Sequence, residues 1–165
     1  EGDDHRAALA RLLKGLKRPL KGRARLRQSP LSARAKPLAE KLAAALKNWV
    51  SRGAIPAVGT EGGGIASLRV VSHNACRNRN NASNGRLSEH AHGRAIDIAG
   101  IGLQDGTEIT VLSGWGPSED GAQLRQLWRA ACGPFGTVLG PEANRFHADH
   151  FHFDTARYRS GSYCR

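Results

Sequence analysis

Two short segments rich in histidine and carboxylate side chains constrain the fold of this chain most strongly. Residues 88–98 read Ser-Glu-His-Ala-His-Gly-Arg-Ala-Ile-Asp-Ile, and residues 147–154 read His-Ala-Asp-His-Phe-His-Phe-Asp. Together they contain the residue types from which proteins build catalytic zinc sites, where three protein ligands leave a fourth position open. The fold must therefore bring two segments that are remote in sequence close together.

Strand periodicity orients the candidate ligand of the first segment. Gly93 permits a bend after the first histidines, because glycine adopts backbone angles that are closed to other residues. The residues that follow alternate, so Asp97 lies on one strand face while Ile96 and Ile98 lie on the other. This pattern predicts a carboxylate beside small side chains, with room for an ion.

The second segment has the same alternation. His150, His152 and Asp154 share one strand face, and Phe151 and Phe153 share the other. The two apolar rings fix the register, because a slip of one residue would bury the histidines. We therefore expect both segments to be strands anchored to one core.

The first motif resembles that of a known group of zinc enzymes. Its spacing, Ser-x-His-x-x-Gly-x-Ala-x-Asp, is similar to the zinc-binding motif of D-Ala-D-Ala peptidases and of the wider group containing lysostaphin-type and penicillin-insensitive murein endopeptidases. The later His-x-His resembles that group's second motif. From about Leu38 to the C-terminus, the chain more closely resembles the extensin-like C-terminal domain family. The stretches that carry this likeness are residues 75–77, 88–90, 95–100, 131–132 and 147–152.

The resemblance implies a role for each residue of the site. His90, Asp97 and His152 fall on the three positions that hold Zn²⁺. The general base is either Asp149, which matches the glutamate of the D-Ala-D-Ala peptidases, or His150, which matches the catalytic histidine of the murein endopeptidases.

Strand alternation favours one of these two bases. It places His150 on the same face as His152 and Asp149 on the opposite face, so we expect His150 to be the base unless the strand bulges. Arg77 falls where related enzymes carry an arginine that stabilises the developing oxyanion. Two further histidines, His92 and His147, are rival ligands, hydrogen-bond partners of ligands or exposed side chains.

The resemblance implies a function as well. We expect a zinc metallopeptidase that hydrolyses an amide bond in peptidoglycan stem or cross-link peptides, as an endopeptidase or a carboxypeptidase. The sequence leaves open whether the bond is D,D or L,D, and it leaves the oligomeric state open. The alternative is a non-catalytic cell-envelope or nucleic-acid-binding protein with a structural metal site. A fourth side chain bound to the metal would favour that alternative.

The charge of the chain is unevenly distributed. The net charge is +11, and residues 11–52 contain thirteen Lys or Arg but a single acid, Glu40. Such a segment attracts polyanions, which include nucleic acid, anionic lipid and acidic cell-wall polymers. Together with the resemblance, this charge leads us to expect peptidoglycan, an anionic cell-wall polymer, as the partner. Aromatic residues do not interleave the basic run at residues 14–36, which disfavours single-stranded nucleic acid. We divide the chain into a basic N-terminal helix and linker at residues 1–35 and a zinc peptidase-like domain at residues 36–165.

Three cysteines indicate the compartment. A disulfide between Cys132 and Cys164 would tie the C-terminal tail to the body, and Cys76 would then be a free thiol. A disulfide is typical of an oxidising compartment, so we expect an exported bacterial protein of the periplasm or cell exterior. The chain contains no apolar run long enough to span a membrane.

The remaining pattern predicts the fold class. Helical periodicity appears at residues 37–49 and 118–131, and a hairpin is expected from strands at 96–101 and 107–112 that turn at Asp105-Gly106. A short strand is expected at Val138-Leu139. The order of elements predicts an α+β domain, with helices on one face of a small antiparallel sheet and the zinc site on the other face.

Overall fold

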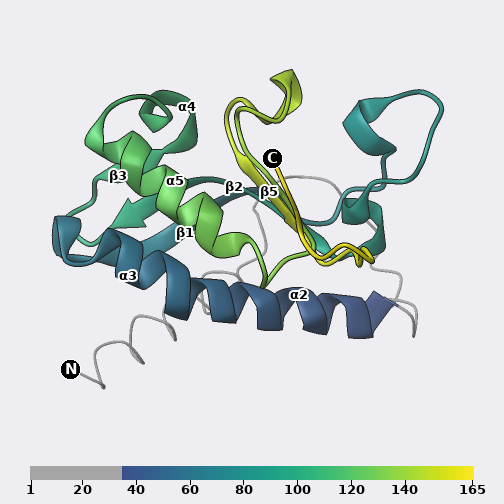
Figure 1. Cartoon of the computed structure of the whole chain (residues 1–165), viewed down its shortest axis with the longest axis horizontal. Helices are drawn as coiled ribbons and strands as arrows, with labels where there is room; N and C mark the ends of the chain where they lie inside the picture. The colour runs from purple at the N-terminus through teal and green to yellow at the C-terminus, as the bar shows by residue number, and fades with distance from the viewer. Residues whose placement is uncertain (1–34) are drawn as a thin grey trace, which may run out of the picture.

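The computed structural model describes residues 35–165 (Figure 1). The predicted N-terminal helix and basic linker lie outside the described residues, so the domain boundary at residue 35 stays a prediction. The described part begins with helix α2, Ala35–Trp49, which lies along one side of the sheet. From Ala35 onward, none of the helices combines the length and the apolar character that a bilayer crossing requires.

A mixed six-stranded sheet forms the centre of the fold. Its order is β1-β2-β5-β4-β6, and β3 pairs with the part of β2 that β5 leaves unpaired. Strand β2 is therefore the central strand, paired along one edge with β1 and along the other with β5 and β3. The strand bounds are β1 Ile65–Ser72, β2 Ala95–Leu103, β3 Glu108–Thr110, β4 Thr137–Leu139, β5 Phe151–Asp154 and β6 Tyr163–Cys164.

The prediction of a purely antiparallel sheet is wrong at one edge. Strand β6 pairs with β4 in the parallel direction, whereas the other strand pairs are antiparallel. The chain reverses direction from β4 to β5 and reverses again before β6. After these two reversals β6 runs in the same direction as β4. Because β6 pairs with the free edge of β4, this pair is parallel.

The predicted helices are present with nearly the expected bounds. After α2 the chain continues through a π-helical turn, η1 Val50–Ala54, into α3, Ile55–Val58. Helix α5, Glu119–Ala131, begins after Ser118, whose hydroxyl accepts a hydrogen bond from Gly121 N. The hairpin at Asp105-Gly106 is also confirmed. The predicted second strand of this hairpin ends early, because the Thr110 side chain caps a short helix, α4 Val111–Gly114.

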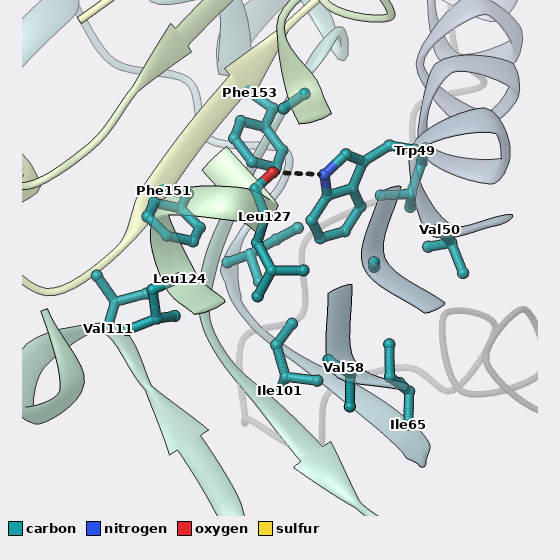
Figure 2. Close-up of a cluster of buried hydrophobic side chains, with 14 of the residues drawn as sticks. Trp49, Val50, Val58, Ile65, Ile101, Val111, Leu124, Leu127, Phe151 and Phe153 are labelled. Carbon is teal, nitrogen blue, oxygen red and sulfur yellow. Dashed lines mark hydrogen bonds between the residues drawn. The ribbon is translucent and has the colours of Figure 1, made fainter. Parts of the chain in front are cut away.

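The hydrophobic core lies between the helices and one face of the sheet (Figure 2). Trp49 is fully buried, and its ring meets that of Phe153 edge-on, with 5.2 Å between the centroids. The indole Nε1 donates a hydrogen bond of 2.9 Å to the carbonyl oxygen of Leu127. This bond satisfies the only polar atom of the tryptophan side chain and joins the end of α2 to α5 across the core.

Alternation along β2 separates two chemically different faces of the sheet. Ile96 and Ile98 belong to the apolar core, whereas Asp97 lines a cleft on the opposite face. The loops at residues 73–88 and 140–150 both project on the side away from α2 (Figure 1). The cleft therefore lies between loops, on a rigid strand floor.

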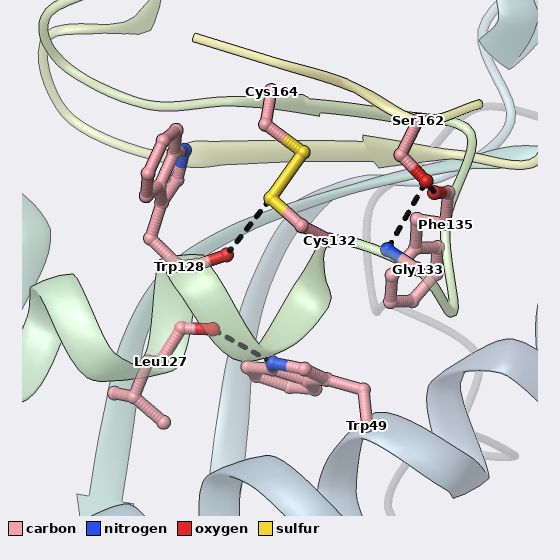
Figure 3. The surroundings of a disulfide bond; sticks show 8 residues. All are labelled: Trp49, Leu127, Trp128, Cys132, Gly133, Phe135, Ser162 and Cys164. Atoms are coloured by element: carbon pink, nitrogen blue, oxygen red, sulfur yellow. Dashed lines mark hydrogen bonds between the residues drawn. A yellow bond between two sulfur atoms is a disulfide. The ribbon is translucent and has the colours of Figure 1, made fainter. Parts of the chain in front are cut away.

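The predicted disulfide is present. Cys132, at the end of α5, is bonded to Cys164 in β6, and Ser162 adds hydrogen bonds to Gly133 N and to the Phe135 carbonyl (Figure 3). Cys76 is a free and exposed thiol, as predicted. Both halves of the cysteine prediction are thus confirmed, and the disulfide explains why a two-residue strand is held at the sheet edge.

Candidate metal centre

His90 reaches the cleft from a tight turn rather than from a strand. The 3-10 turn η4, Glu89–His92, begins after Ser88, whose hydroxyl accepts a hydrogen bond from His90 N at 3.3 Å. It ends at Gly93, which has a left-handed conformation with φ of 67°. Glycine adopts this conformation without the steric cost that a side chain would impose. The motif's serine and glycine therefore shape the turn that carries the histidine.

Glu89 anchors the same turn through ion pairs. Its buried carboxylate accepts hydrogen bonds from Arg79, at 2.8 Å, and from Arg94. A buried carboxylate paired with two guanidinium groups is satisfied on both oxygens. This ion pair fixes the η4 turn to the loop before it and to the start of β2.

The other two predicted ligands face each other across a strand pair. Asp97 of β2 and His152 of β5 are direct register partners, and both residues are buried. The Asp97 Oδ1 atom lies 2.9 Å from His152 Nδ1 and 3.0 Å from His90 Nε2, and the two nitrogens are 3.1 Å apart. The three predicted ligands thus converge as a nearly equilateral triangle of donor atoms.

The outer hydrogen bonds of the two rings decide which nitrogen carries the proton. His90 Nδ1 lies 3.2 Å from the carbonyl oxygen of His73, which can only accept, so the proton is on Nδ1. His152 Nε2 lies 3.2 Å from a carboxylate oxygen of Asp154, so in the neutral ring the proton is on Nε2. Both lone pairs then point at the Asp97 oxygen. When both rings are neutral, three buried acceptor atoms therefore face one another, and either a proton or a metal ion between them offsets their repulsion.

The donor set fits a zinc ion. Zinc with ligand bonds of about 2.0–2.1 Å separates tetrahedral ligands by roughly 3.3 Å, close to the observed 2.9–3.1 Å. Two neutral imidazoles and one carboxylate are also ligands that zinc accepts. His90, Asp97 and His152 can therefore hold a metal ion. The same donor types suit several divalent transition metals, so the triangle by itself does not choose among them.

The pKa shifts of Asp97 and His152 in the metal-free site also indicate that the site needs a positive charge. Burial alone would raise the pKa of Asp97, but hydrogen bonds from His152 and His90 outweigh burial and hold that pKa below its usual 3.8. Burial would lower the pKa of His152, but hydrogen bonds to Asp154 and Asp97 raise it to about 9. Without metal, a proton on His152 supplies the missing charge, and a metal ion must displace that proton to bind.

The two candidate bases are connected to each other. His150 Nδ1 lies 2.7 Å from Asp149 Oδ1, and His150 Nε2 faces the ligand triangle, 3.8 Å from Asp97 Oδ1. The His150 side chain is 15% exposed, whereas that of Asp149 is 64% exposed. Of the two, His150 therefore presents its free nitrogen to the site, and Asp149 holds the proton on the far side of that ring.

The two extra histidines have different positions. His147 is buried beside the rings of His150 and His152, and its Nδ1 lies 2.9 Å from Asn144 Oδ1. Burial, together with the charges of His152 and His150, lowers the pKa of His147 to about 4. This ring is therefore neutral at pH 7. His92 is exposed on the η4 turn.

The three candidate ligands, the two candidate bases and His147 line one cleft of about 520 Å³, whereas His92 does not. Arg77 lies in its wall, with a guanidinium nitrogen 3.8 Å from Asp97 Oδ2, beyond hydrogen-bonding distance. Apolar side chains also form part of the lining, and three of them are large and strongly exposed: Val71, Phe146 and Tyr158. The cleft thus combines a polar floor with an apolar rim, as binding sites for organic ligands do.

The family model for the extensin-like protein C-terminus matches residues 14–165 of the chain. The chain belongs to this family. The match begins at residue 14, whereas the resemblance seen in the sequence begins only at about Leu38. The matched range therefore includes most of the basic segment at residues 11–52. No curated protein and no solved structure matches the chain.

Three groups around the ligands contribute to the site of this extensin-like domain, although the motifs do not single them out. Asp154 orients His152, and its other oxygen accepts a hydrogen bond from Ala156 N at 2.8 Å. Its signal was the alternation that places it on the same face as His152. The His73 carbonyl and the Asn144 amide carried no such signal, because they reach the site from loops.

Proposed function

We propose that this extensin-like domain is a zinc-dependent peptidase that cleaves an amide bond in peptidoglycan stem or cross-link peptides. The observation that carries the proposal is the convergence of three candidate metal ligands, His90, Asp97 and His152, beside the imidazole of His150, which the Asp149 carboxylate orients. The resemblance of the two motifs to those of D-Ala-D-Ala peptidases and murein endopeptidases supports the choice of reaction and substrate.

The residues around the triangle suit amide hydrolysis. A zinc ion in such a site polarises a carbonyl group and makes water acidic enough to supply a nucleophile near neutral pH. His150 Nε2 takes the proton of the attacking water and returns one to the leaving amine. Asp149 keeps the His150 proton on Nδ1, so Nε2 is available as the acceptor. Arg77 supplies a cation in the cleft wall for the developing oxyanion.

The basic N-terminal third suits an anionic cell-wall polymer. Its cations attract carboxylate or phosphate groups, and salt weakens this attraction because exposed charges are screened beyond about 8–10 Å at ordinary ionic strength. The full chain should therefore bind purified sacculi more tightly in dilute than in concentrated salt, as measured by co-sedimentation. Binding that does not change with salt would contradict this role. The disulfide is in keeping with export to the periplasm or cell exterior.

The test is digestion of purified muropeptides by the zinc-loaded protein, with product masses read by mass spectrometry. We expect a mass gain of one water per cut, and the product masses identify the bond. His150→Ala should retain zinc and lose activity by a factor on the order of a hundred or more, because a positioned general base contributes about that much. Asp149→Ala should lose less, since it acts through His150.

The same variants separate the proposed enzyme from a structural metal protein. His150 Nε2 lies only 3.8 Å from Asp97 Oδ1, close enough that a small rotation would make it a fourth ligand. If His150→Ala loses its zinc, the imidazole closes the site and the structural alternative is correct. If Asp149→Ala abolishes activity while His150→Ala barely changes it, Asp149 is the base.

A further inference from the structure

A second hollow, of about 680 Å³, lies on the helix side of the molecule. Helix α2 forms one wall, and the turn at residues 133–136 and the segment at residues 155–162 form the others. Tyr158 lines both this hollow and the metal cleft, and its hydroxyl lies 3.1 Å from Thr137 Oγ1 in the cleft wall. The two hollows therefore meet at one half-exposed tyrosine.

The charge of the second hollow is of a single sign. Lys41 and Arg157 are its charged lining residues, and no Asp or Glu lines it. Within residues 35–165, neither cation takes part in an ion pair. The metal cleft, by contrast, has charged lining of both signs: the carboxylates Glu89, Asp97, Asp149 and Asp154 lie there beside Arg77 and Arg79. Because the charged lining of the second hollow is wholly cationic, that hollow attracts an acidic ligand group.

An unsatisfied hydroxyl points to a ligand independently of charge. Thr155 lines the second hollow, and its Oγ1 is buried without a hydrogen-bond partner in the described part of the chain. A buried polar atom without a partner destabilises the protein. Rotation of the Thr155 side chain would turn this hydroxyl toward the hollow, where a ligand that offers a hydrogen-bonding group would remove that cost.

We propose that the second hollow is a subsite for a carboxylate-bearing arm of the substrate, and this rests on the proposed function. The scissile amide lies over the metal ligands, the chain passes Tyr158, and the carboxylate lies near Lys41 and Arg157. A ligand that reaches both hollows has to extend past Tyr158. The preferred substrate class is accordingly an acidic peptide with at least one free carboxylate away from the scissile bond.

The test compares one disaccharide-peptide fragment with free carboxylates and the same fragment with those carboxylates amidated. The zinc-loaded full chain should cleave the free form with the higher kcat/KM, the difference lying in KM. In the double variant Lys41→Gln/Arg157→Gln this preference should fall by about five- to tenfold, as for two partly screened charge contacts. Lys47→Gln, an exposed cation on the same helix that does not line the hollow, is the matched control and should retain the preference.

Thr155→Val removes the hydroxyl and keeps the shape of the side chain. Affinity for the free-carboxylate fragment, measured by isothermal titration calorimetry, should weaken by about threefold while the melting temperature does not fall. Unchanged affinity in this variant and an unchanged preference in the double variant would overturn the subsite and leave the proposed hydrolysis intact. If the wild type cleaves neither fragment, the proposed function fails. The calorimetric loss in the double variant then decides the subsite alone.

Discussion

The two faces of the β2–β5 strand pair use the same backbone for opposite purposes. On one face, Phe151 and Phe153 belong to an apolar core that is complete without any ligand. On the other face, Asp97 and His152 are equally well positioned by the same register, yet their acceptor atoms converge. The first face stabilises the fold by burial alone, whereas the second needs a positive charge among its acceptor atoms, supplied by a proton on His152 or by a metal ion.

This difference shows how the strand pair can hold several acceptor atoms close together. The two aromatic rings of β5, Phe151 and Phe153, stack on each other with 5.8 Å between their centroids, and Phe153 also stacks on Phe135 at 4.9 Å. Their burial fixes the register, and the register in turn fixes where His152 stands relative to Asp97. The apolar face is therefore the scaffold that positions the polar face.

The largest effect is expected on the polar face. His152→Ala should reduce bound zinc from about one equivalent to almost none, because two ligands seldom hold zinc tightly. The variant should stay folded, since the apolar face is unchanged. Elemental analysis measures the metal and circular dichroism the fold.

A second histidine of the same motifs serves as the control for that experiment. His92→Ala removes an exposed ring from the η4 turn and should keep its full metal content. Undiminished zinc in His152→Ala would refute the ligand assignment.

The next effect is expected on the apolar face. Phe153 is fully buried, and Phe153→Ala should lower the free energy of unfolding by about 3–5 kcal/mol through lost burial and the cavity left behind. Chemical denaturation of the metal-free protein measures this loss. The matched change Phe146→Ala, at a 43% exposed ring, should cost far less. Similar losses for both variants would mean that the core does not act as the scaffold.

The smallest effect concerns the link between the two faces. Asp154→Asn keeps the size of the side chain but weakens its hold on His152 Nε2, and should reduce zinc affinity by about 10- to 100-fold. Competition with a chelator measures the affinity without relying on catalysis. Asp120→Asn, in the first turn of α5, is the control. Equal affinities in the two variants would show that Asp154 has only a structural role.

Local patterns predicted the parts of the site that lie on strands. Alternation placed Asp97 opposite Ile96 and Ile98, and placed His152 and Asp154 on one face, because a strand has a period of two. The same argument could not predict that Asp97 and His152 are register partners, since that pairing depends on how far β5 slides along β2. Strand alternation also could not predict the position of His90, because His90 lies in a 3-10 turn.

The errors in the predicted fold have physical reasons too. Val111 continues the apolar alternation that Ile109 begins in β3, but the Thr110 side chain competes with the strand by capping a helix. Strand β6 has only two residues, too few for any periodicity, so its parallel pairing with β4 left no trace in the sequence. The disulfide prediction was the one sign that the tail lies beside α5.

The disulfide and a metal ion held by the candidate ligands would form two cross-links that interleave along the chain. Cys132 and Cys164 close a ring with a sequence separation of 32, and an ion bound between Asp97 and His152 would close another with a separation of 55. His152 lies inside the disulfide ring while Asp97 lies outside it. A reductant alone therefore leaves β5 tethered to β2 through the ion, and a chelator alone leaves the tail tethered to α5. Unfolding of the C-terminal third becomes unrestricted only when both links are broken.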